Sequence, residues 1–107
     1  EGTASVLIDN EVVEIHAGGW HLRPRMIEHT FFNATDKPLR FIDMYFNQPF
    51  EDYLDRIFHQ LTEENGFKEG SKEKIDEIMK LNDKFGLFFK PDAFTRKDEI
   101  MKKYHLK

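Results

Sequence analysis

The chain has 107 residues, no cysteine and a formal net charge of −4 at pH 7. This length suits one domain with a single modest core. The acidic balance argues against a general nucleic-acid binder, since phosphate contacts need a concentrated basic surface. The lack of cysteine excludes a disulfide framework and a cysteine-based zinc cluster. No apolar run has the length of a membrane span, so we expect no membrane binding. The lack of cysteine fits a reducing compartment, so we expect a cytoplasmic protein, and from its charge one that does not bind nucleic acids.

The first half of the chain predicts a β-meander. Runs rich in β-formers flank the turn pair Asp9-Asn10, which predicts a hairpin, and a glycine pair, a proline and a polar turn separate the runs that follow. The predicted strands are Thr3–Ile8, Glu11–His16, Trp20–Arg23, Ile27–Asn33 and Leu39–Phe46.

The hydrophobic period changes from two to 3.6 after Asn47, which predicts helices. The first begins at Pro49 and Phe50 and is stopped by Gly66. The second runs from the N-cap Ser71 to Gly86. A third is predicted over Thr95–Tyr104, and Leu87–Lys90 predicts a further short strand.

One stretch carries a motif. Gly18 is followed after five residues by Pro24, then after four residues by His29 and after three more by Asn33. This order resembles the second conserved motif of the cupin family, except that Met26 stands where the family usually has glycine. The resemblance extends back to Glu1 and Gly2, which are similar to the end of the first cupin motif.

The resemblance implies a mainly β fold. We expect a cupin-like jelly-roll β-barrel, incomplete at its N-terminus, followed by two or three C-terminal α-helices. Residues 1–48 would form the barrel portion, and residues 49–107 a helical extension that packs on the barrel or on a partner subunit.

His29 is the leading site residue. On a strand it shares a face with Ile27, Phe31 and Asn33, so inside a barrel its imidazole would suit a metal or a polar ligand atom. The alternative is a barrel histidine that serves structure alone. In metal-binding cupins the other ligands, typically two histidines and a glutamate, belong to the first motif and would here lie before residue 1.

Other candidates surround this histidine. Four aromatic residues either wall a small-molecule pocket or form plain core: Trp20, Phe31, Phe41 and Tyr45. Asp43 is either a surface residue or a polar group that orients a ligand or His29. In the motif, Gly18 and Pro24 shape the turns, and Asn33 is expected to bond the following turn.

We expect the remaining histidines to lie at the solvent-exposed surface, because no carboxylate partner and no second histidine at helical spacing is recognisable for them in the sequence. They are His16, His21, His59 and His105.

Two functions follow. The first is a small-molecule-binding protein with its pocket around His29. The second is a metal-dependent cupin enzyme, a dioxygenase or an isomerase or epimerase, whose further ligands lie upstream and whose metal is Fe, Mn, Ni or Zn. Because an incomplete barrel leaves open strand edges, we expect a homodimer or pairing with a missing N-terminal fragment.

Overall fold

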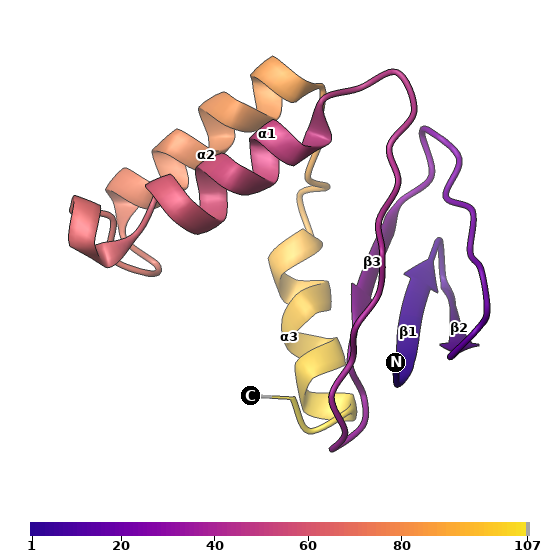
Figure 1. Cartoon of the computed structure of the whole chain (residues 1–107). Helices are drawn as coiled ribbons and strands as arrows, with labels where there is room; N and C mark the ends of the chain where they lie inside the picture. Colours follow the sequence, from indigo (N-terminus) through magenta and orange to yellow (C-terminus); the bar gives the residue numbers. More distant parts are fainter. Residues whose placement is uncertain (107) are drawn as a thin grey trace. The chain divides into compact units, whose positions relative to one another are not determined.

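The structure is a computed structural model, and it describes residues 1–106. It divides into two compact units. The first consists of Glu1–Asp43 together with the chain from Phe94 onward, and the second is Met44–Ala93. Figure 1 shows the elements in chain order. Each unit is described by itself below.

The first unit contains a three-stranded antiparallel sheet of order β2-β1-β3. Its strands are β1 (Thr3–Ile8), β2 (Glu11–His16) and β3 (His29–Phe32). The predicted hairpin is confirmed, because β1 and β2 pair in register around a turn in which Asp9 has a φ of 56°. The central strand β1 has a hydrogen-bonded neighbour on both sides, so the sheet can grow only beyond β2 or β3.

The predicted mainly β fold is wrong. Residues 1–106 hold three short strands and three α-helices, and the sheet does not close into a barrel. The segments Trp20–Arg23, Leu39–Phe46 and Leu87–Lys90 lie outside the strands. Their apolar residues predicted an extended backbone, but a strand also needs a continuous ladder of backbone hydrogen bonds to a neighbour. Leu39–Phe46 bonds the Glu1 backbone at Arg40 without forming such a ladder.

The pairing register determines which side chains lie on each of the two faces of the sheet. Residues paired directly across strands lie on the same face, so Val6 and Ile8 share a face with Phe31 and His29. The opposite face carries Phe32 and the buried residues Ser5 and Leu7.

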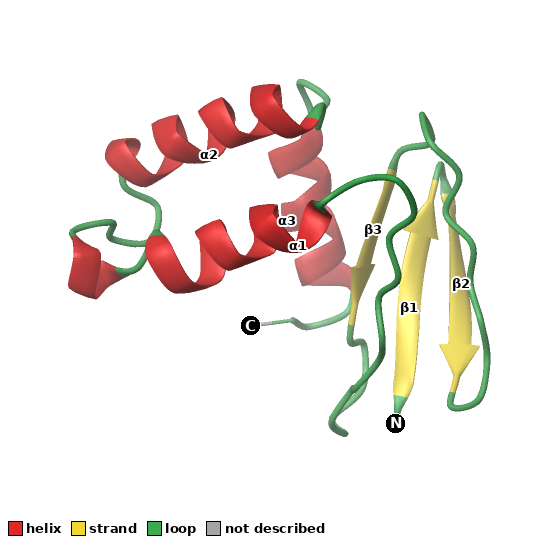
Figure 2. Cartoon of the chain, turned by 45° about the horizontal axis from the view of Figure 1, so that its top comes forward, coloured by secondary structure: helices red, strands yellow, loops and turns green. Residues whose placement is uncertain are grey.

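Helix α3 (Ala93–Lys103) covers this opposite face. The ring of Tyr104, which follows the helix, packs against the Phe32 ring with centroids 4.9 Å apart. In Figure 2 the part of α3 that belongs to the first unit runs beside β3, on one side of the sheet. On the face that carries His29, Val6 is buried, whereas His29 and Phe31 remain exposed along β3.

Arg96 of α3 makes the longest-range polar contact in this unit. Its guanidinium forms an ion pair with the Glu28 carboxylate, just before β3. It also donates hydrogen bonds to the Asp9 carbonyl at 3.1 Å and to the Asn10 side-chain oxygen at 3.3 Å. One side chain therefore joins the C-terminal helix to the β1–β2 turn and to the entry of β3.

Gly2 allows two backbone segments to meet. Its φ is +82°, and a Cβ at this position would lie 2.3 Å from the Pro38 carbonyl oxygen, which no side chain tolerates. Next to this approach, the Arg40 amide donates to the Glu1 carbonyl at 2.9 Å. The segment that leads to Phe41 is thereby held at the start of β1.

The second unit is a helical hairpin. Its elements are α1 (Phe50–Asp55), a π-helical turn η1 (Arg56–Gln60), a 3-10 turn η2 (Glu63–Asn65) and α2 (Lys72–Phe85). The predicted end signals of α2 are confirmed: Ser71 Oγ accepts from the Lys74 amide at 3.2 Å, and Gly86 follows in the left-handed region. No helix in the described part of the chain has the length and apolar character to cross a bilayer.

A buried polar pair lies inside the hairpin. Tyr53 of α1 and Asn82 of α2 are both buried, and the Tyr53 hydroxyl donates to Asn82 Oδ1 at 2.8 Å. Burial raises the pKa of Tyr53, so the hydroxyl keeps its proton and remains a donor at neutral pH. The pair fixes how the two helices face each other, because a buried amide without its partner is costly.

We expect Arg96→Met to destabilise the first unit by about 1–3 kcal/mol, because it leaves the partly buried Glu28 carboxylate without this guanidinium. Amide hydrogen exchange in α3 and β3 should become faster. Lys97→Met, at an exposed position of the same helix, is the control and should change stability by less than about 0.5 kcal/mol. Equal effects of the two substitutions would contradict the role given to Arg96.

We expect Tyr53→Phe to lower the free energy of unfolding by about 1–3 kcal/mol, since Asn82 Oδ1 loses its buried donor. Urea unfolding followed by circular dichroism at 222 nm measures this loss. Adding Asn82→Leu to Tyr53→Phe should restore part of the stability, because no orphaned amide is then left behind. If the double variant loses as much stability as Tyr53→Phe and Asn82→Leu lose together when each is measured singly, the two side chains do not act as a hydrogen-bonded pair.

Candidate functional site

His29 begins β3 and is exposed to solvent. Its Nδ1 lies 2.8 Å from the Ile27 carbonyl oxygen. A carbonyl can only accept a hydrogen bond, so in the neutral ring the proton is on Nδ1 and Nε2 presents a lone pair. The bond also fixes the ring orientation. His29 therefore offers an oriented acceptor to a ligand at the exposed start of β3, and not in the interior of a barrel.

Two aromatic rings share this region. Phe31 lies two residues after His29 and so on the same face of β3. Phe41 packs edge to face against it, with centroids 4.9 Å apart and an angle of 81° between the rings. The two residues remain 44% and 47% exposed. The structure thus brings together three predicted site residues: His29, Phe31 and Phe41.

Asp43 is held by a cation. It accepts a hydrogen bond from Arg23 at 2.9 Å, and both side chains are about three-quarters buried, with 28% and 24% exposed. The bond ties the segment after Phe41 to the loop between β2 and β3. Sequence reasoning did not single out Arg23, because the two residues lie 20 positions apart and no spacing rule connects them.

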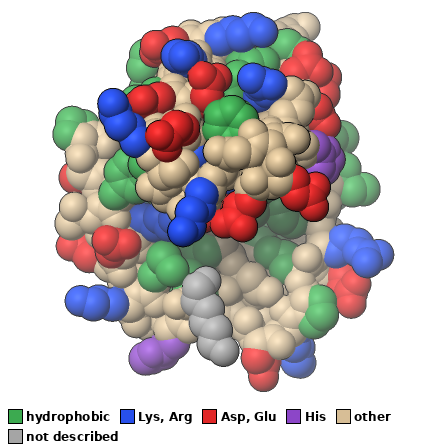
Figure 3. All heavy atoms as spheres, turned by 90° about the vertical axis from the view of Figure 1, so that its left-hand side faces the viewer, with side chains coloured by type: hydrophobic (Ala, Val, Ile, Leu, Met, Phe, Trp, Pro, Cys, Tyr) green, Lys and Arg blue, Asp and Glu red, His purple; other side chains and the backbone are tan. Residues whose placement is uncertain are grey.

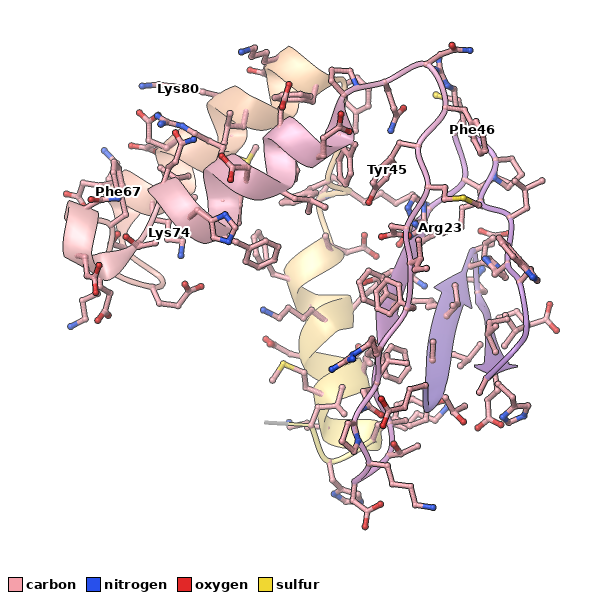
Figure 4. All side chains as sticks on the ribbon, viewed as in Figure 1. Arg23, Tyr45, Phe46, Phe67, Lys74 and Lys80 are labelled. Carbon is pink, nitrogen blue, oxygen red and sulfur yellow. The ribbon has the colours of Figure 1, made fainter. Side chains whose placement is uncertain are left out.

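Two other predicted pocket residues lie elsewhere. Trp20 is 83% exposed in the loop after β2, so it walls no cavity. Tyr45 belongs to the second unit, where its ring packs against Phe50 with centroids 4.9 Å apart. In Figure 4 the Tyr45 side chain points toward the first turn of α1, while Phe46 points the other way.

The motif residues shape the turns around β3. Gly18 has a φ of +85°, and Pro24 precedes the turn at residues 25 and 26. Asn33 closes the turn after β3: its Oδ1 accepts from the Thr35 amide at 3.0 Å, and its Nδ2 donates to the Lys37 carbonyl at 2.7 Å. These are local contacts of the kind that an Asx turn makes.

Met26 adopts the conformation that glycine favours. Its φ is 68°, in the left-handed region, and its side chain is 94% exposed. The turn before β3 therefore keeps a glycine-type backbone although the residue is methionine, at a steric cost that a Cβ brings there.

No three histidine, aspartate or glutamate side chains of residues 1–106 gather so that they could hold a metal ion. His29 alone cannot form such a site.

His59 has a carboxylate partner that sequence reasoning missed, since its Nδ1 lies 2.8 Å from Asp55 Oδ1, one helical turn away. This contact lowers the pKa of Asp55. The i, i+4 spacing of the two residues was a readable signal for it.

On the face shown in Figure 3, basic and acidic side chains are interspersed without a large area of one sign.

Comparison with models of protein families, with curated proteins and with solved structures finds no match to this chain. The resemblance to cupins thus rests on the motif residues themselves.

We expect Met26→Gly to stabilise the first unit by about 0.5–1 kcal/mol, because it removes the left-handed strain at a position whose side chain makes little contact. Slower amide hydrogen exchange in β1 and β3 would measure the gain. Arg25→Gly, in the same turn but without a positive φ, should instead lose stability. If both substitutions destabilise equally, the strain at Met26 is not relieved by glycine.

Proposed function

We propose that the first unit binds a small aromatic molecule that carries a hydroxyl group, on the sheet face that bears His29. The observation that carries this proposal is the half-exposed Phe31–Phe41 pair, which lies on the same face as the oriented His29 ring.

Each part of the site suits one part of such a ligand. The edge-to-face pair offers apolar surface to a third ring, and burying that surface favours binding. The lone pair on His29 Nε2 accepts a hydrogen bond from a ligand hydroxyl. A ring with a hydroxyl uses both, whereas a plain hydrocarbon uses only the first. The cupin resemblance supports the same location for a ligand, on the strand that bears the motif histidine.

A metal-dependent enzyme of cupin type is the second candidate. The observation that favours it is the bond from His29 Nδ1 to a backbone carbonyl, the arrangement that orients many metal-binding histidines. The described residues do not fit a complete metal site, so binding is the preferred function. Pairing with a second copy or with a preceding segment stays a prediction.

Titration of the full chain with phenol, followed by NMR, tests the proposal. Phenol should shift the resonances of His29, Phe31 and Phe41. Toluene has the same ring without the hydroxyl and should bind about three- to tenfold more weakly, as expected for one lost hydrogen bond. His29→Ala should weaken phenol binding by the same factor and leave toluene unaffected.

Matched controls come from other exposed residues. His105→Ala removes an exposed histidine near the C-terminus and should leave phenol binding unchanged. Phe31→Ala should weaken phenol and toluene alike, whereas Phe88→Ala, at a largely exposed phenylalanine, should weaken neither. Equal phenol affinity of the wild type and His29→Ala would rule the proposed site out.

A further inference from the structure

A small cavity lies within the helical hairpin, beside the start of α1 and the end of α2. Its volume is about 240 Å³, and it is lined by Gln48, Pro49, Phe50, Lys84 and Phe85. A wider groove of about 600 Å³ shares three of these lining residues and continues along the hairpin. The small cavity is therefore the apolar end of a longer hollow, and it is open to molecules in solution.

The charges of the wider groove largely neutralise one another. Glu77 accepts a hydrogen bond from Lys80 at 3.0 Å and lies 3.9 Å from the Arg56 guanidinium, which also donates to Gln60 at 2.5 Å. In Figure 4 Lys80 projects outward from α2. Asp52 and Asp55 also line the groove, so its three acidic side chains balance Arg56, Lys80 and Lys84 in formal charge.

Lys84 is different. Among residues 1–106 it forms no ion pair with a carboxylate, and it is the one charged residue that lines the small cavity. Its Nζ lies 5.6 Å from the centroid of the Phe85 ring, within the range of a cation–π contact. An ammonium group is therefore placed at an apolar wall, with donor capacity left for a ligand.

The apolar wall is supported by ring contacts with the buried Tyr53. The Phe50 ring stacks on the ring of the buried Tyr53, with centroids 4.9 Å apart, and Tyr53 meets the Phe85 ring edge on at 5.6 Å. Tyr45 packs against the other side of the cluster through Phe50. Since Tyr53 is also held by Asn82, these rings form a preformed surface, which lowers the cost of ordering the site on binding.

We propose that this cavity binds a small organic monocarboxylate with an aromatic or other compact apolar body. The carboxylate accepts a charge-assisted hydrogen bond from Lys84 Nζ, and the body lies against Phe50 and Phe85. The volume equals that of about eight water molecules in the liquid, which suits a single substituted ring. Within the small cavity itself a cationic ligand is disfavoured, because Lys84 is the charged residue of its lining.

This site is independent of the one at His29, since all its residues belong to the second unit. It also asks for a different ligand chemistry, a carboxylate in place of a hydroxyl donor. The two proposals can therefore succeed or fail separately.

Titration of the full chain with benzoate and with benzamide tests the inference, because the two probes have the same shape and differ in charge. NMR shifts should map to Gln48–Phe50 and to the end of α2. Benzoate should bind about three- to tenfold more tightly than benzamide. Lys84→Met should remove that preference and leave benzamide binding intact, which also shows that the cavity is still folded.

Two further variants sharpen the result. Lys80→Met removes a lysine one helical turn earlier and should leave the preference for benzoate unchanged. Lys84→Arg keeps the charge and should retain most of it. Shifts centred on His29, equal affinity for the two probes, or a full preference for benzoate in Lys84→Met would each overturn the inference.

Discussion

The first unit depends on one guanidinium that joins parts of the chain 68 residues apart, Glu28 and Arg96. An arginine that is mostly buried needs partners for its donors, and here a carboxylate, a backbone carbonyl and a side-chain amide supply them. This contact places α3 over the face of the sheet that carries Phe32. Helix α3 therefore packs on the face opposite to His29, and His29 and Phe31 stay exposed at β3.

Exposure to solvent changes what His29 does. In a closed barrel the imidazole would be surrounded by apolar walls, but here it is exposed and only the bond to Ile27 fixes its direction. The neighbouring phenylalanines are half exposed, so a ligand would bury part of their surface and leave the rest in contact with water. Such a site favours small ligands with one apolar side and one polar group.

In the second unit, a single buried hydrogen bond aligns the helices α1 and α2. Helix α1 has only six residues and α2 has 14, so the pair buries little apolar surface, and the hydrogen bond from Tyr53 to Asn82 fixes their alignment within that small core. The rings of Phe50 and Phe85 pack around Tyr53 and end at the cavity beside Lys84. The proposed carboxylate site is thus a consequence of how this core is closed.

Local features of this protein could be read from its sequence. The β1–β2 hairpin, the Ser71 cap and the stop at Gly86 depend on residues a few positions apart, and the structure confirms them. The helix predicted from Pro49 to Gly66 is wrong in its extent, because α1 ends at Asp55 and the helical turn η1 ends at Gln60. The barrel could not be read correctly, because an alternating pattern specifies an extended backbone but not the neighbour it must bond. The pairs Arg23–Asp43 and Arg96–Glu28 likewise have no spacing signal. Only the tertiary structure brings such residues together, because the chain between them sets their distance and local preferences do not.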